Sequence, residues 1–275
     1  KPELEDKYTR RLSITSELKK ALASHQGELS MVYQPKIDLA TMKVSSMEAL
    51  IRWNNSVLGF VPPDEFITIA EQAGLIEQVT TWVMQRTISD LAYFRNKGYS
   101  FTIAMNLSTQ DIQNKILLDN LVNILKDKGL SPEALELEIT ESDLVADASL
   151  AIQNLTELTS KGFSFAIDDF GTGYSSLAYL KSLPVTTIKI DKSFILDLAN
   201  DDYDKQIVHT VLALARAFDL KVVAEGVEDI ASLEILKDWG CNIIQGYYIS
   251  RPLKKTDLEE WLESSPYSEN VVTSC

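Results

Sequence analysis

Eight polar or charged side chains recur where apolar, strand-like runs of this chain end. Each lies on the less bulky face of its run, because the side chains of a strand point alternately to opposite sides. One buried polar residue is readily explained as a satisfied core group, but burying unpaired charge costs several kcal/mol. The repetition therefore predicts a functional site that contains Gln34, Glu48, Asn106, Glu138, Asp168, Lys189, Glu225 and Gln245.

The side-chain types favour a site for divalent metal ions. Oxygen donors dominate, and no His or Cys joins them, since His25 and His209 fall in segments with a helical pattern. Oxygen-only coordination suits Mg²⁺ or Mn²⁺ rather than zinc. Crowded carboxylates repel one another unless cations lie between them. The acidic donors exceed the needs of one ion, so we expect two ions that share Asp168; the donors are Glu48, Glu138, Asp168, Asp169 and Glu225, with the amide of Asn106.

Two metal ions suit a phosphoryl displacement. They can clamp the attacking and leaving oxygens and bring the pKa of a bound water towards about 7. Lys189 could then orient that water or offset charge that develops on the phosphate. The residues alone leave open a second kind of enzyme, a barrel that uses a divalent metal to act on a small carboxylate.

The stretch 168–176 joins two adjacent aspartates to a loop with two glycines. Taken alone, it is consistent with a helix cap or a turn. No Gly-Lys-Ser/Thr follows, which argues against a nucleotide P-loop. Beside the other polar residues, the stretch is interpreted as half of a metal site, in which the glycines let the backbone bend so that Asp169 reaches the second ion.

The elements that must position these residues alternate along the chain. Amphipathic patterns predict helices at 4–24, from 62 onward, and at 75–97, 117–128, 148–161, 204–218, 230–239 and 255–263. Period-2 runs predict strands at 29–35, 43–53, 101–107, 134–140, 163–169, 186–191, 221–225 and 242–246.

Eight strands that are mostly followed by helices predict an α/β fold, a modified TIM (β/α)₈ barrel. A short turn at 38–42 predicts one antiparallel strand near the N-terminus. The barrel is expected at 28–264, before a polar C-terminal tail at 265–275. Residues 1–27 are expected to pack on the barrel as a flanking helix or to connect it to an upstream domain. The helix would present one apolar side with Leu12, Ile14, Leu18, Ala21 and Leu22.

Composition limits the partners. The 275 residues carry a formal net charge of -14, so duplex nucleic acid is not an expected ligand. No apolar run approaches the ~20 residues that cross a bilayer, so no membrane contact is expected from this segment. Cys241 and Cys275 form no metal-binding pattern. They predict free thiols in a reducing, cytoplasmic setting, although other segments of a longer protein could anchor it to a membrane.

Eight short segments follow one another in a set order: YQP at 33–35, EALIRW at 48–53, MNLS at 105–108, EITE at 138–141, DDFGTGYSS at 168–176, IKID at 188–191, AEGVE at 224–228 and QGY at 245–247. In this order they resemble the EAL-domain phosphodiesterases, which hydrolyse cyclic di-GMP in bacterial signalling. The resemblance covers residues 28 to 263, and it is specific as a series rather than in any one segment.

The resemblance implies roles for the site residues. The implied metal ligands are Glu48, Asn106, Glu138, Asp168, Asp169 and Glu225, where Glu225 binds through water or acts as the base. The implied catalytic group is Glu48, Lys189, Glu225, Gln245 and Glu141. Within it, Lys189 and Gln245 position the water and the scissile phosphate, and Glu141 braces the 168–176 loop. The implied substrate contacts are Gln34, Leu50, Arg52 and Asp191.

The resemblance predicts hydrolysis of cyclic di-GMP to linear 5′-pGpG with two Mg²⁺ or Mn²⁺ ions, and Ca²⁺ is expected to be inhibitory. The alternative is a non-catalytic receptor that binds the dinucleotide and signals to a partner. Such receptors usually lose metal ligands or the loop, and this chain keeps both. The loop also implies coupling to an upstream regulatory or sensor domain, with a homodimer as a possible assembly.

Overall fold

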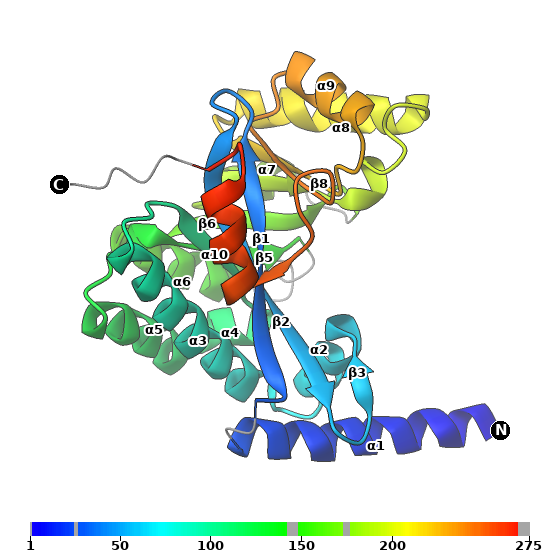
Figure 1. The fold of residues 1–275 in the computed structure, drawn as a ribbon, viewed down its shortest axis with the longest axis vertical. Coiled ribbons are helices and arrows are strands. Elements are labelled where there is room, and N and C mark those ends of the chain that lie inside the picture. Colours follow the sequence, from blue (N-terminus) through cyan, green and yellow to red (C-terminus); the bar gives the residue numbers. More distant parts are fainter. Residues whose placement is uncertain (1, 25–26, 142–147, 173–176, 269–275) are drawn as a thin grey trace.

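Eight strands close into a barrel within the residues that the computed structural model describes, which are 2–24, 27–141, 148–172 and 177–268 (Figure 1). The order around the barrel is β1, β9, β8, β7, β6, β5, β4 and β2, and the pairing of β2 with β1 closes it. This confirms the predicted modified TIM barrel. Its strands are β1 (Leu29–Asp38), β2 (Lys43–Asn55), β4 (Thr102–Asn106), β5 (Leu135–Thr140), β6 (Ser164–Phe170), β7 (Thr187–Ile190), β8 (Lys221–Glu225) and β9 (Ile243–Gln245).

Strand β1 runs opposite to its neighbours, as the short turn predicts. It pairs antiparallel with β2 and β9, whereas the other neighbouring pairs around the barrel are parallel. Asp38 stabilises the turn, because its carboxylate accepts hydrogen bonds from the backbone N–H groups of Ala40 and Thr41 at 2.9 Å. The β1–β2 register places Gln34 opposite Glu48, so two predicted site residues are neighbours.

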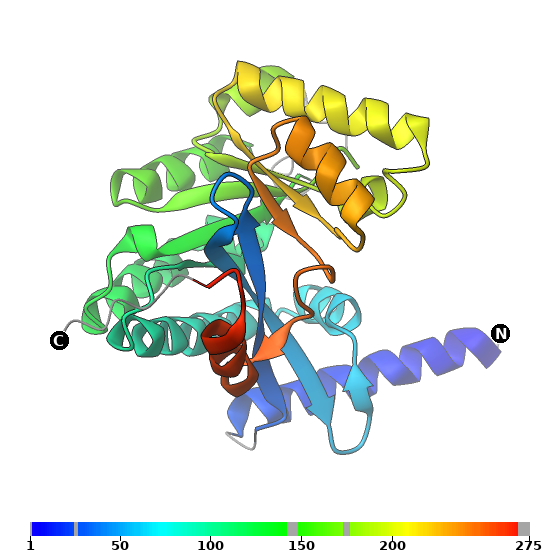
Figure 2. The same ribbon diagram turned by 45° about the horizontal axis from the view of Figure 1, so that its top comes forward.

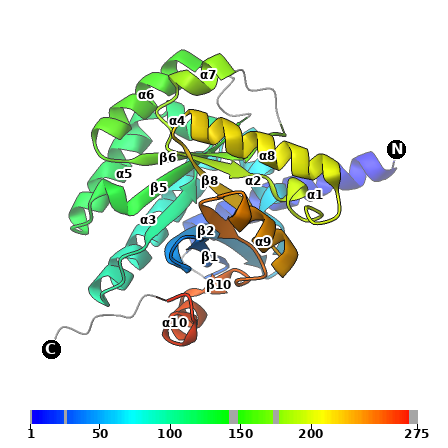
Figure 3. The same cartoon turned by 90° about the horizontal axis from the view of Figure 1, so that it is seen from above.

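Helices cover the outside of the barrel, as the view from above shows (Figure 3). Each of the predicted helices is present, with ends within two residues of those expected. They are α1 (Pro2–Ala23), α2 (Pro63–Gln72), α3 (Ile76–Asn96), α5 (Lys115–Asp127), α6 (Ala148–Ser160), α8 (Asp202–Ala217), α9 (Ile230–Asp238) and α10 (Lys255–Ser264).

Short elements lack enough residues to show a period, and the sequence pattern does not predict them. They are β3 (Gly59–Val61), α4 (Thr109–Gln113), the 3₁₀ helices η1 (Pro132–Ala134) and η3 (Lys192–Phe194), α7 (Leu177–Ser182) and β10 (Leu253–Lys254). Helix α4 begins with a capping box: the Ser108 hydroxyl accepts from Asp111 N at 3.2 Å, and the Asp111 carboxylate accepts from Ser108 N at 2.9 Å. The cap holds the chain two residues after the site residue Asn106.

Strand alternation separates the hydrophobic core from the polar interior. On β5 and β6, Leu137, Ile139, Phe165 and Ile167 belong to the hydrophobic core cluster and are almost fully buried. Glu138 and the other interior side chains take the intervening positions. The apolar layer between strands and helices therefore fixes the direction in which the polar side chains point.

Helix α1 packs against α2 and α3 by part of its length and extends beyond them (Figure 2). Ile14 and Leu18 are fully buried, and Arg10 forms a bidentate ion pair with Glu65 of α2 at 2.5 and 2.7 Å. The prediction that Leu12 shares this buried side is wrong, since its side chain is 54% exposed. Two residues before Ile14, it lies on the other side of a helix with 3.6 residues per turn.

The predicted C-terminal tail begins with contacts to β2. The backbone N–H of Val44 donates to Tyr267 O at 2.8 Å, and Lys43 Nζ donates to Pro266 O at 3.0 Å. Residues 269–275 lie outside the described residues, as do His25 and Cys275. Cys241 is a buried free thiol, as predicted. Among the described helices, none is long and apolar enough to cross a membrane.

Candidate active site

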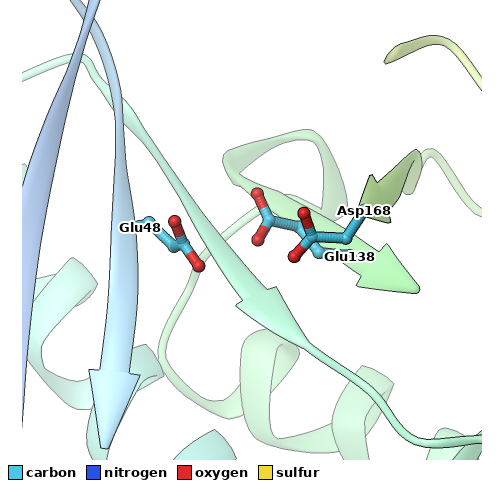
Figure 4. A group of neighbouring side chains, drawn as sticks. All are labelled: Glu48, Glu138 and Asp168. Carbon is cyan, nitrogen blue, oxygen red and sulfur yellow. The ribbon is translucent and has the colours of Figure 1, made fainter. Parts of the chain in front are cut away.

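Three carboxylates from different strands meet inside the barrel. Glu48 on β2, Glu138 on β5 and Asp168 on β6 each offer an oxygen within 4.8 Å of the others (Figure 4). Glu48 and Glu138 are 5% and 0% exposed, so their charges are held away from bulk water. The sequence pattern predicted this convergence, because period 2 places one polar side chain from each strand on the interior face.

A second cluster of three carboxylates shares one residue with the first cluster. Asp168, Asp169 and Glu225 also offer oxygens within 4.8 Å of one another. Asp168 therefore belongs to both groups, which is the position expected of a residue that bridges two ions. Oxygen-rich groups of this kind suit hard divalent cations.

Lys189 lies among these carboxylates. Its side chain is fully buried, and burial alone would lower its pKa; the surrounding carboxylates outweigh burial and raise the pKa well above its usual value. The ammonium is therefore permanently charged at physiological pH. Its Nζ atom lies 2.8 Å from Glu138, 2.8 Å from Glu225, 3.0 Å from Asp168 and 3.5 Å from Glu48.

The carboxylates do not all ionise equally. Burial raises the pKa of Glu48, but Lys189 and Lys36 outweigh burial and bring it down to about 2. Burial and the charge of Glu48 raise the pKa of Glu138 to about 7. Burial, with help from Asp168, raises the pKa of Glu225 to about 8 and that of Asp169 to about 6. Divalent cations between these carboxylates would relieve the repulsion among their negative charges. The number of oxygen donors and their charge therefore fit such ions.

Two amides complete the inner site. The Gln245 amide nitrogen donates to Glu48 at 2.6 Å and to Gln34 at 3.0 Å, and the Asn106 amide nitrogen donates to Glu48 at 3.3 Å. The Gln245 amide oxygen is buried and has no hydrogen-bond partner within the described residues. Gly246 allows this placement, since a Cβ there would lie 2.1 Å from Val227 O. The unpaired amide oxygen is a further acceptor for a cation or its water.

The backbone bends within β6, two residues before the first glycine of the loop. Asp169 itself has a φ of 54°, in the left-handed region that non-glycine residues rarely adopt, and Gly171 follows with a φ of 99°. Glu141 holds this bend, because its carboxylate accepts from Gly171 N at 3.2 Å and its backbone N–H donates to Asp168 O at 3.1 Å. Residues 173–176 of the predicted loop lie outside the described residues.

A cavity of about 920 Å³ opens over the site. The predicted substrate contacts Gln34, Leu50 and Arg52 line it, together with Glu48, Asp168 and other carboxylates of the site. Asp191 is not among the lining residues within the described chain; its carboxylate caps η3 by accepting from Ser193 N at 2.9 Å.

The site also contains residues that the alternation pattern does not predict. Lys36 on β1 is fully buried, and its Nζ lies 2.5 Å from Glu138. Its even spacing from Gln34 in an otherwise apolar run could have marked it as interior. The cavity wall also includes Asp64 and Ile67 from α2 and Tyr247 after β9, which no strand-end pattern predicts.

The EAL-domain family model matches residues 15–252 of this chain. The chain belongs to the EAL domain family. The cyclic di-GMP phosphodiesterase PA2567 of Pseudomonas aeruginosa is 38% identical over 261 residues, which cover 95% of this EAL domain chain and 44% of that relative. The chain spans 33–44% of the length of three curated relatives from that organism.

Solved EAL structures have the same fold as this EAL domain. The PaMucR phosphodiesterase in complex with c-di-GMP superposes with a TM-score of 0.85 at 39% identity, covering 90% of this chain and 99% of that one. The FimX EAL domain from Pseudomonas aeruginosa bound to c-di-GMP gives a TM-score of 0.79 at 31% identity, covering 87% and 96%.

Proposed function

We propose that this EAL domain is a metal-dependent phosphodiesterase that hydrolyses cyclic di-GMP to linear 5′-pGpG. The observation that carries the proposal is a pair of carboxylate groups that share Asp168 and surround the buried ammonium of Lys189, beside a cavity of about 920 Å³. The name of PA2567 and the ligand in the PaMucR structure support this substrate. Membership of the EAL family supports a role for this activity in bacterial second-messenger signalling.

We assign two Mg²⁺ or Mn²⁺ ions to the two carboxylate clusters, whose oxygen donors fit such ions. The proposed ligands are Glu48, Asn106, Glu138, Asp168, Asp169 and Glu225. When bound, such ions polarise the scissile phosphate and lower the pKa of a bound water. Ca²⁺ tolerates a larger and looser shell, so it would hold the donors at unproductive distances and inhibit.

The chain's own residues supply positioning and proton handling. The Lys189 ammonium is fixed by its carboxylate neighbours, so it can donate to the attacking water and offset phosphate charge. Glu225 lies 2.8 Å from Lys189, where its carboxylate can accept a proton from the attacking water. Gln245 holds Glu48 in place through its amide nitrogen.

Substrate contacts follow from the cavity lining. Arg52 can bind a phosphate or a guanine edge with its forked guanidinium, and Gln34 and Leu50 lie on the same wall. Asp191 stays a predicted contact; its neighbour Lys192 lines the cavity. Control by an upstream regulatory or sensor domain, a homodimer and a cytoplasmic location also stay predictions.

The direct test is incubation with cyclic di-GMP and Mg²⁺ or Mn²⁺, followed by chromatographic separation of products. We expect pGpG, and we expect Ca²⁺ to suppress its formation. Glu48→Gln is the matched variant, because it keeps the size of a buried side chain and removes one charge. It should bind the dinucleotide and fail to cut it. Binding without cleavage by the unaltered chain would favour the receptor function instead.

A further inference from the structure

Lys36 is a buried cation that the proposed reaction does not use. It lies on β1, and its side chain has no exposed surface. Its ammonium faces two acidic residues of β5, Glu138 at 2.5 Å and Glu136 at 3.7 Å. Because β2 and β4 separate β1 from β5 in the barrel, this ion pair spans the interior rather than linking adjacent strands.

The register of β1 explains how Lys36 reaches Glu138. Lys36 is opposite Ser46 on β2 and Gln245 on β9. It lies two residues along β1 from Gln34, which is paired with Glu48, so both side chains point to the same face of the strand. Ser46 has a short side chain, which leaves room inside the barrel for a long one. Lys36 therefore approaches the carboxylates from the layer beneath the one that faces the cavity.

Glu138 is held from two sides. Its Oε1 accepts from Lys36 at 2.5 Å, and its Oε2 accepts from Lys189 at 2.8 Å. Two opposed charge-assisted hydrogen bonds fix both the position and the rotation of a carboxylate. Lys36 also favours the ionised form of Glu138 and so opposes the rise of its pKa that burial causes.

Lys189 has several partners and cannot fix Glu138 alone. Its ammonium also serves Asp168, Glu225 and Glu48 at 3.0, 2.8 and 3.5 Å. Lys36, in contrast, contacts no acidic group of the site other than Glu138 within the described residues. Glu136, its second partner, is anchored separately by the Thr187 hydroxyl at 3.2 Å.

We propose that Lys36 is a positioning residue of the metal centre, whose ammonium holds Glu138 in the orientation that groups it with Glu48 and Asp168. The role rests on the proposed metal centre, and it assigns to Lys36 a contribution to metal affinity. Groups that orient metal ligands typically contribute 10–100-fold to affinity, so a loss of about this size is expected when Lys36 is replaced.

The test is a double-mutant cycle on Mn²⁺ binding. Titration calorimetry and the electron paramagnetic resonance signal of free Mn²⁺ measure the affinity of each variant. Lys36→Met and Glu138→Gln should each weaken binding by about 10–100-fold. The double variant should bind as weakly as Glu138→Gln alone, because Lys36 acts through Glu138. Glu136→Gln is the matched control; it removes the weaker partner of Lys36 and should leave the affinity unchanged.

The outcomes separate the two proposals. A wild-type chain that binds no Mn²⁺ would overturn the proposed metal centre itself. Wild-type binding with an unchanged Lys36→Met affinity, or losses that add in the double variant, would overturn the role of Lys36 alone. If Lys36→Met does not fold, Lys36→Gln, which keeps a hydrogen-bond donor, takes its place. Failure of both variants to fold would assign Lys36 to the fold and also overturn its positioning role.

Discussion

Lys189 is the most constrained side chain of the site, since four carboxylates surround its buried ammonium. Lys189→Met should lower kcat by roughly 10²–10⁴-fold, the scale of a lost positioning or proton-transfer group. Steady-state kinetics with cyclic di-GMP measures this. The control Lys181→Met removes an exposed lysine that does not line the cavity and should leave kcat unchanged. Equal kcat values for both variants would remove Lys189 from the mechanism.

The raised carboxylate pKa values predict how metal binding depends on pH. The pKa values of Asp169, Glu138 and Glu225 are raised to about 6, 7 and 8, so protons compete with cations most strongly below pH 6. In the metal-free chain, the stability that protonation of these groups contributes is lost as pH rises from their ordinary pKa values, near 4, to their raised values of about 6–8.

Mn²⁺ at one fixed concentration should therefore raise Tm more at pH 8.5 than at pH 6. Differential scanning calorimetry with and without the ion gives the two shifts. An equal shift at both values, or a larger one at pH 6, would contradict the assignment of these carboxylates as ligands.

At the scale of elements, the segment after β6 links backbone geometry to the site. Gly171 follows Asp169 by two residues. Gly171→Ala forces an L-residue into a φ of 99° and places its Cβ 3.2 Å from Cε2 of Phe194. Gly129→Ala is the control, because its φ of 67° also lies on the positive side while open space surrounds it. Each should cost about 1–2 kcal/mol of stability. Only Gly171→Ala should also weaken Mn²⁺ binding and lower kcat. If both variants changed the Mn²⁺ affinity equally, the bend would not position Asp169.

Helix α1 gives a second prediction at this scale. Leu18 is fully buried where α1 packs against α2 and α3, whereas Leu12 on the same helix is 54% exposed. Leu18→Ala should lower the free energy of unfolding by about 2–5 kcal/mol, and Leu12→Ala should change it by less than about 0.5 kcal/mol. Urea unfolding followed by circular dichroism compares them. Similar midpoints would mean that α1 does not pack as described.

At the scale of the whole molecule, the barrel and much of its polar interior follow from the sequence. Period-2 alternation identified Glu48, Glu138 and Asp168, because a strand's period assigns each side chain to a face. It missed Lys36, whose contact with Glu138 crosses the barrel and depends on the reversed direction of β1. Such a contact exists only once the strands close.

Other features depend on geometry that no period encodes. The positive φ of Asp169 is set by the surrounding loop, and a carboxylate residue gives no sign of it in sequence. The cavity wall from α2 depends on how that helix packs over β2, so Asp64 and Ile67 could not be assigned. The apolar type of Leu12 predicts burial, but its angle around the helix turns it away from Ile14, which is why it is exposed.

The proposed function requires that water opens one phosphodiester bond of cyclic di-GMP in this site. Hydrolysis in H₂¹⁸O with Mg²⁺, followed by mass spectrometry, tests it most directly. In forming 5′-pGpG, water attacks phosphorus, the bond to the 3′-oxygen breaks, and the released 3′-oxygen takes a proton to become a hydroxyl. The expected product is linear pGpG with one ¹⁸O in its terminal 5′-phosphate, and Glu48→Gln should form no product. Bound but intact cyclic di-GMP, or a product without ¹⁸O, would contradict it.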